Sequence, residues 1–189
     1  PEFIKRLEAS VELPAPLPMT KWARQPMEIR NLFNPAFCTR LLHLALKEYY
    51  KEKKQGMPFA LLFLILPIVL HSSTRTRLPR GVMTKFHSWL DTNQDVKVGF
   101  AQRTRDLVPI TKLALSFGLE SGHITVTDED KFIVTPKRFV SLKKRLGKSD
   151  DLIDETEIAE IERKTSFIGR WYAQAGTVSS IYVMWGVSP

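Results

Sequence analysis

Apolar residues recur every three or four positions in three long stretches of the chain, which is the spacing of an amphipathic helix. The first stretch, 34–56, starts at Asn34, a residue that caps helices, and ends in lysines and a glycine, which suit a helix C-terminus. The second stretch, 99–120, contains Pro109, which should kink or restart the helix. The third begins in a run of acids and ends before Gly176. A mainly helical protein is therefore predicted.

The most apolar stretch, 57–70, has no polar face. Its 14 residues are fewer than the roughly 20 that a helix needs to cross a bilayer, and Pro67 interrupts it. An apolar surface on all sides is typical of a helix that is buried among several neighbours. We therefore expect a central core helix over about 58–71, then a polar loop and a short helix near 84–90.

The apolar period changes to two in "ITVTDEDKFIV", which predicts a β-hairpin over 123–135. Helices closed by a two-stranded hairpin are the outline of a winged helix, a fold that serves DNA binding and protein contacts alike. The alternating apolar residues of "SSIYVMWGV", 179–187, predict a final strand. The predicted class is α+β: mainly α-helical and winged-helix-like around 57–136, with the hairpin and a C-terminal strand.

The first 18 residues differ in character from the rest of the chain. They begin with "PEF", which is typical of a cloning-vector remnant, and end in a proline-rich stretch before Met19. A natural start at Met19 is our hypothesis, and a native extended arm is the alternative. Residues 19–189 are long enough for one domain of ordinary size, and we expect a single domain there.

Basic residues outnumber acidic ones, so the formal net charge is +8, which favours an anionic partner, either nucleic acid or an acidic protein surface. Residues 72–105 hold seven Lys or Arg and two acids, and residues 136–148 hold six Lys or Arg. The candidate contact residues for a partner or for DNA are Arg75, Arg77, Arg80, Arg103, Arg105, Lys137, Arg138, Lys143, Lys144 and Arg145.

Three of these candidates, Arg75, Arg77 and Arg80, follow the apolar block directly. Little acid lies near them in the sequence, so we expect three guanidinium groups to leave the end of a rigid core helix. Guanidinium groups bind carboxylates and phosphates through paired hydrogen bonds, which suits a contact with an anionic partner. A solvated face with local ion pairs is the alternative interpretation.

Catalytic motifs are not found in the sequence. There is no glycine-rich phosphate loop, and the four histidines lie in separate predicted elements without the spacing of metal ligands. The single cysteine, Cys38, cannot form an internal disulfide, and we expect a core residue in a reducing cytoplasm. Asp91 and Asp95 beside Lys97 resemble part of a nuclease site, but these residue types are typical of a turn. No enzymatic activity, cofactor or metal is expected.

Several short phrases occur together in a specific order: "NPAFC" (34–38), "GMPF" (56–59), "LPIVLH" (66–71), "TRTRLP" (74–79), "VGFAQR" (98–103) and "RWYAQAGTVSSIYVMWGV" (170–187). From about Trp22 to the C-terminus, the sequence resembles the middle component of bacterial three-component ABC systems. This family is related in role to the small accessory subunit of Lamassu-type anti-phage defence.

The resemblance implies a non-catalytic cytoplasmic subunit that joins an SMC-like ABC ATPase to an effector. DNA is a further candidate partner, directly or through the complex, and a membrane is not. The resemblance also implies architectural roles: Asn34 and Pro35 start a helix, Pro58 and Pro67 shape the central helix, and Arg75 is its charged exit. The alternative, from a different class, is a stand-alone winged-helix DNA-binding transcriptional regulator.

Overall fold

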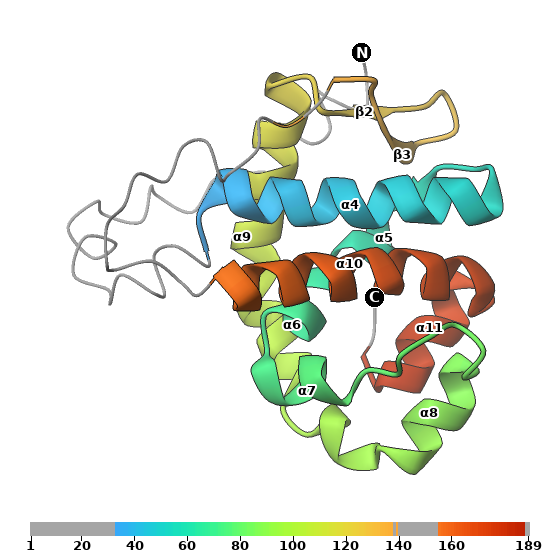
Figure 1. Ribbon diagram of the computed structural model, residues 1–189. Helices are drawn as coiled ribbons and strands as arrows, with labels where there is room; N and C mark the ends of the chain where they lie inside the picture. The colour runs from blue at the N-terminus through green and yellow to red at the C-terminus, as the bar shows by residue number, and fades with distance from the viewer. Residues whose placement is uncertain (1–32, 138, 140–154, 188–189) are drawn as a thin grey trace.

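A computed structural model of the chain describes residues 33–137, 139 and 155–187. The helices and strands of this part (Figure 1) are α4 (Pro35–Lys53), β1 (Met57–Pro58), α5 (Phe59–Leu62), α6 (Ile65–Val69), α7 (Ser72–Arg77), α8 (Phe86–Thr92), η1 (Gln94–Lys97), α9 (Phe100–Glu120), β2 (Ile124–Val126), β3 (Lys131–Val134), α10 (Glu155–Gln174) and α11 (Val178–Trp185). The mainly helical fold with one small antiparallel sheet confirms the predicted α+β class. The predictions for 1–18, Arg138, Lys143, Lys144 and Arg145 lie outside the described residues.

Helix α4 begins as the sequence predicts. The side chain of Asn34 accepts a hydrogen bond from the Ala36 N–H (2.9 Å), and Pro35 is the first helical residue. The helix ends at Lys53, three residues before the predicted glycine, and Lys54 caps it in the left-handed conformation (φ 57°). Gly56 serves another purpose, because an added Cβ there would lie 2.7 Å from the Cβ atom of Lys131 in β3.

Helices α4 and α10 lie side by side and run in the same direction (Figure 1). Polar pairs join them at a constant sequence separation of 122 residues, namely Arg40–Glu162, Glu48–Arg170 and Glu52–Gln174. A constant separation requires a parallel pair, because an antiparallel pair would change it from one contact to the next. The two backbones come so close that an added Cβ at Gly169 would lie 2.3 Å from the Ala45 carbonyl oxygen. Helix α6 packs against both helices, and α9 packs against α4.

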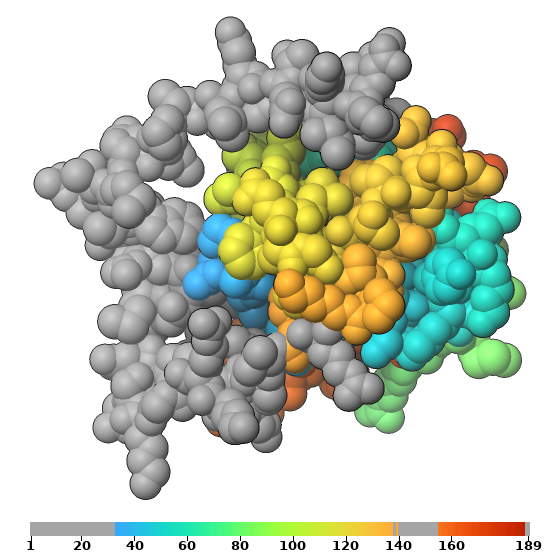
Figure 2. Space-filling model, turned by 90° about the horizontal axis from the view of Figure 1, so that it is seen from above, coloured from blue at the N-terminus to red at the C-terminus, as the bar shows by residue number. Residues whose placement is uncertain are grey.

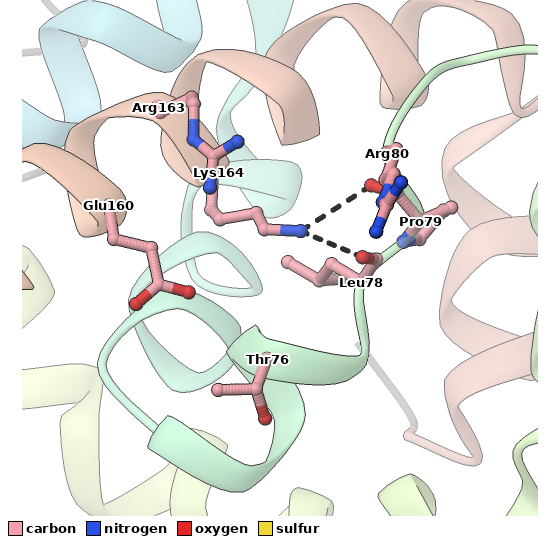
Figure 3. Close-up of a pocket in the computed structure, with 7 residues that line it drawn as sticks. All are labelled: Thr76, Leu78, Pro79, Arg80, Glu160, Arg163 and Lys164. Atoms are coloured by element: carbon pink, nitrogen blue, oxygen red, sulfur yellow. Dashed lines mark hydrogen bonds between the residues drawn. The ribbon is translucent and has the colours of Figure 1, made fainter.

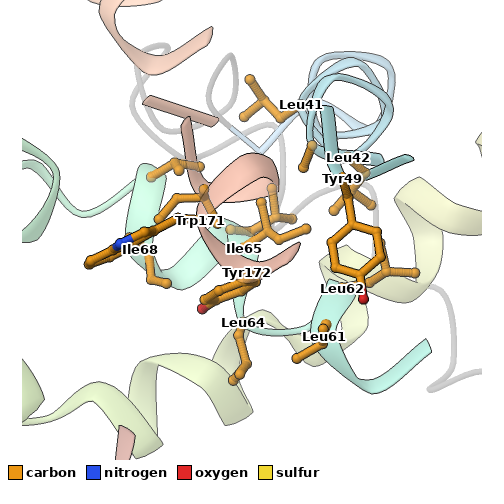
Figure 4. Packing of buried hydrophobic residues seen from close by; sticks show 14 of the residues in the cluster. Leu41, Leu42, Tyr49, Leu61, Leu62, Leu64, Ile65, Ile68, Trp171 and Tyr172 are labelled. Atoms are coloured by element: carbon orange, nitrogen blue, oxygen red, sulfur yellow. The ribbon is translucent and has the colours of Figure 1, made fainter. Parts of the chain in front are cut away.

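The apolar block 57–70 is buried, as predicted, but it is not one helix. Its first two residues form β1, which pairs with β3, and the rest forms the short helices α5 and α6. Pro67 has no N–H, and as the third residue of α6 it lies in the first turn, where N–H groups have no intrahelical partner. Leu64 and Ile65, at the junction of the two helices, are fully buried (Figure 4). The predicted single helix over 58–71 is wrong, and its place in the core is confirmed.

Three further helices, α7, α8 and α9, follow the apolar block 57–70. Helix α7 lies within the predicted polar loop, and α8 confirms the short helix expected near 84–90 with its bounds shifted by two residues. Helix α9 confirms the prediction for 99–120 and continues through Pro109, so a restart at this proline is wrong. Pro109 is exposed, and water can therefore hydrate the Arg105 carbonyl oxygen, which the proline leaves without an N–H partner.

The segment 179–187, predicted as a C-terminal strand, forms helix α11 instead. The side chain of Thr177 caps this helix by accepting from the Ser180 N–H, and Gly186 ends it at φ 69°. Ile181 and Trp185, four residues apart, lie on one face of the helix and are buried. β-Branched and aromatic residues favour a strand only where a pleated, half-buried surface is available. Burial of one helical face decides the structure here.

Strands β2 and β3 confirm the hairpin predicted for 123–135. Val126 pairs with Phe132 across the hairpin, and Met57 of β1 pairs with Phe132 from the other side, which gives the sheet order β1–β3–β2. The sheet lies against α4, on the side opposite α10 (Figure 1). Together with the C-terminal end of α9 it forms one face of the molecule (Figure 2). The winged-helix outline and the single domain over 19–189 stay predictions.

Candidate functional site

Arg75, the first arginine after the apolar block, is buried rather than presented to a partner. Its side chain is 3% exposed and donates hydrogen bonds to the Val69 carbonyl oxygen (3.0 Å) and the Glu157 carboxylate (2.7 Å). The Glu160 carboxylate lies 3.7 Å from the Nε atom of Arg75. Arg75 therefore connects α7 to α6 and α10. The prediction of a charged exit is wrong because the neutralising acids come from a helix that is remote in sequence.

Replacing Arg75 by alanine is expected to lower the free energy of unfolding by about 1–3 kcal/mol, since the Val69 carbonyl oxygen loses a buried donor and the packed side chain is lost. Arg77→Ala removes an exposed pair with Asp95 and should change this free energy by about 1 kcal/mol or less. Urea unfolding of both variants measures the difference. Equal losses in the two variants would contradict the buried role of Arg75.

The other two arginines of the trio differ from each other. Arg77 forms an ion pair with Asp95, and both side chains are largely exposed. Arg80 is exposed and makes no ion pair with any residue that the structure describes. The expectation that little acid neutralises the trio is therefore wrong for two of its members and stands for Arg80.

Arg80 lines a cleft between α10 and the segment that follows α7, with a volume of about 580 Å³. We call it the α7–α10 cleft (Figure 3); its lining residues are Thr76, Leu78, Pro79, Arg80, Glu160, Arg163 and Lys164. Lys164 is 8% exposed and donates hydrogen bonds to the carbonyl oxygens of Leu78 (2.7 Å) and Pro79 (3.5 Å). Burial lowers the pKa of the Lys164 ammonium, and the charges of Arg163 and Arg80 lower it further.

Sequence reasoning does not find Arg163 and Lys164 as site residues. In the sequence they follow the acids of the last predicted helix, where cations complement the helix dipole. Only the fold brings them beside Arg80, which lies more than 80 positions earlier in the chain. The sequence does place them three and four positions after Glu160, so all three share one side of a helix. This spacing alone does not indicate that an arginine from another segment lies beside them.

The remaining candidate residues within the described ranges do not join this cleft. Arg103 donates to the carbonyl oxygens of Val98 and Val96 and lies over the Phe100 ring, 5.7 Å from its centroid. Its role is to hold the turn before α9. Arg105 is exposed on α9. Lys137 follows the hairpin and donates to the Ser121 carbonyl oxygen (2.7 Å). Arg103, Arg105 and Lys137 are therefore spread over several surfaces of the molecule.

A second hollow lies between α4 and the residues after β3, with a volume of about 460 Å³. Phe139 stacks on His123 with ring centroids 3.9 Å apart and meets the edge of His43. Burial lowers the pKa of His43. Arg40 at its rim is already engaged by Glu162 of α10. The lining of this hollow is therefore mixed, with aromatic rings and cations among its residues.

The described residues hold no group of three or more His, Cys, Asp and Glu side chains placed to bind a metal ion. Cys38 is buried, and burial raises the pKa of its thiol to about 12, which confirms a core residue. Asp95, one of the acids considered for a nuclease site, is engaged by Arg77. None of the helices in the described ranges is both long and apolar enough to cross a bilayer.

Comparison with known proteins identifies the chain's relatives. Residues 22–189 match the model of the family described as ABC-three component (ABC-3C) system Middle Component 3. The chain belongs to this family. Membership confirms the resemblance predicted from the sequence, which begins at the same residue, Trp22. A middle component of a multi-component system has protein partners. No curated protein and no solved structure matches the chain.

Proposed function

We propose that this ABC-3C middle component is a non-catalytic accessory subunit that links an SMC-like ABC ATPase to an effector in a bacterial anti-phage defence complex in the cytoplasm. Membership of the middle-component family, over residues 22–189, is the observation that carries the proposal. A linking role requires surfaces that bind other proteins. A surface that binds a protein differs from one that binds DNA in its apolar and charged residues.

The exposed face of α9 supports protein contact over DNA contact. Pro109, Leu113 and Phe117 follow each other at four-residue spacing, and the side chains of Leu113 and Phe117 are 51% and 39% exposed. Arg105 and Asp106 continue this face at its N-terminal end, and Glu120 continues it at the C-terminal end. Helices that read duplex DNA present donors to bases and cations to phosphates. An apolar face with one cation and two acids at its ends fits a protein surface better.

Co-expression with the ATPase and effector encoded beside the gene tests the proposal. A tag on the middle component should retain both proteins after nuclease treatment, because protein contacts do not need DNA. Retention of only one would leave the linking role unsupported, and retention of neither would overturn the proposal.

The stand-alone regulator is the second candidate, and one observation favours it. The sheet order β1–β3–β2, with α9 directly before the hairpin, is compatible with a winged helix. A regulator should bind a specific operator as an isolated chain. A salt titration of duplex binding decides the matter, since phosphate contacts give a slope of about −0.9 per neutralised phosphate in log K against log salt. Operator-specific binding without co-purification of the ATPase would replace the first proposal with this one.

A further inference from the structure

Three cations line the α7–α10 cleft. Arg80 comes from the segment after α7, and Arg163 and Lys164 come from α10 (Figure 3). One carboxylate, Glu160, shares the lining, and it also faces the buried Nε atom of Arg75 at 3.7 Å. Arg80 and Arg163 make no ion pair with the residues that the structure describes. The lining therefore keeps a positive surplus that nothing in these ranges neutralises.

Lys164 makes the cleft more than a group of surface cations. Its side chain is more than nine-tenths buried, and its ammonium group has three N–H donors. The Leu78 and Pro79 carbonyl oxygens accept two of them, at 2.7 and 3.5 Å, and the second contact is long. One N–H donor is therefore left for an anion, and Lys164 lines the cleft. The positive charges of Arg163 and Arg80 repel the Lys164 ammonium and lower its pKa, in addition to the effect of burial. A bound anion would offset this repulsion.

The surroundings of the cleft distinguish between possible anions. Two acids of α10, Glu157 and Glu160, lie on the side of the helix that faces Arg75 of α7, and their side chains are 41% and 30% exposed. A nucleic-acid backbone places a charge every few ångströms, so phosphates beside the bound one would meet these acids and be repelled. A single carboxylate avoids that repulsion. A basic residue next to it on the same partner would meet the acids of α10.

From these observations we infer that the α7–α10 cleft binds one Asp or Glu side chain of a partner protein, held by Arg80 and Arg163 with the buried ammonium of Lys164 behind them. The inference rests on the proposed function for the existence of the partner, namely the ATPase or the effector of the same system. The inference adds the chemistry of the contact. An acidic side chain of the partner enters a cleft lined by cations, and basic residues beside it on the partner approach the acids of α10.

The test uses the full chain co-expressed with the ATPase and the effector. The Arg80→Glu, Arg163→Glu double variant should weaken capture of one partner by about tenfold or more, because it places like charges around the entering carboxylate. Lys47→Glu, Lys85→Glu is the matched control: it changes the net charge equally at two exposed positions outside the cleft and should stay within about twofold of wild type. Circular dichroism checks folding, and Arg80→Gln, Arg163→Gln replaces the first variant if it is unfolded.

A cross-link identifies the partner residue. In an Arg80→Lys, Arg163→Lys variant, a carbodiimide joins lysine amines to carboxylates in direct contact, and mass spectrometry locates the acid. Changing that acid to arginine should restore capture by the Arg80→Glu, Arg163→Glu variant. Cross-links only to residues of this chain would overturn the inference.

The outcomes separate the inference from the proposed function. If the wild-type chain captures neither partner, the proposed function fails. If it captures both and the cleft variant does so equally well, only the inference fails. Equal losses in the cleft variant and the control variant would indicate general electrostatic attraction and overturn it too. Loss of binding to a 20-base-pair duplex with unchanged capture of proteins would assign the cleft to nucleic acid instead.

Discussion

Replacing Leu64 by aspartate is expected to unfold the protein. Leu64 has no exposed surface and lies at the junction of α5 and α6, within the main hydrophobic cluster (Figure 4). An unpaired carboxylate in such a place costs several kcal/mol or shifts its pKa to become neutral, and the leucine packing is lost in either case. A typical domain is stable by only about 5–15 kcal/mol. Far-UV circular dichroism during thermal and urea unfolding should show no cooperative transition.

The control for this variant is Met83→Asp. Met83 is 91% exposed in the segment before α8, so an aspartate there stays hydrated and should change the free energy of unfolding by about 0.5 kcal/mol or less. A Leu64→Asp protein that melts cooperatively at the wild-type midpoint would show that the apolar block is not the core.

Long amphipathic helices are predictable from the sequence because their signals are local. For α4, the capping Asn34, the following proline and the spacing of apolar residues all lie within the helix and its first turn. The hairpin is predictable for the same reason, since a polar turn separates two alternating runs. The bounds of these elements differ from the prediction by a few residues, as at Lys53, where the helix ends before the expected Gly56.

Short apolar segments are not predictable in the same way. The residues of α5 and α6 are all apolar and mostly buried, and the open side of α11 carries an apolar residue, Val183, which is 76% exposed. Their sequences therefore lack the continuous polar face that distinguishes a helical period from an alternating one. The neighbouring elements decide their structure. The start of the apolar block becomes a strand because β3 lies beside it, and 179–187 becomes a helix because one helical face reaches the core.

The candidate site also depends on contacts between residues that are far apart in the sequence. Arg75 follows an apolar block and has no acid nearby in the sequence, yet Glu157 lies 82 positions away and pairs with it in the fold. Lys164 receives its carbonyl partners from Leu78 and Pro79, at separations of 86 and 85 positions. Among the residues that the structure describes, Arg75 and Arg77 have acidic partners, and of the three arginines predicted to form a contact only Arg80 has none there. Composition predicts that a positive surface exists, whereas contacts between distant segments determine which cations form it.

The second large effect is expected at the contact between α4 and α10. Gly169 lies inside α10, where alanine would ordinarily stabilise a helix by about 1 kcal/mol. Here an added Cβ would lie 2.3 Å from the carbonyl oxygen of Ala45 and 3.0 Å from its Cα and carbonyl carbon atoms. These are backbone atoms inside a helix, so they cannot turn aside as a side chain would. The parallel helices must move apart, which weakens the packing along their length.

We therefore expect Gly169→Ala to lower the free energy of unfolding by about 2 kcal/mol or more, since overpacking in a tight core exceeds the gain in helix propensity. Gly118→Ala is the matched helical control: its Cβ would meet the end of the Ile124 side chain at 2.7 Å, and that side chain can rotate, so the loss should be smaller. Gly81→Ala has open space and should be near neutral. Urea unfolding of the three variants should rank them in this order of decreasing loss, and a neutral or stabilised Gly169→Ala would disprove the close parallel contact between α4 and α10.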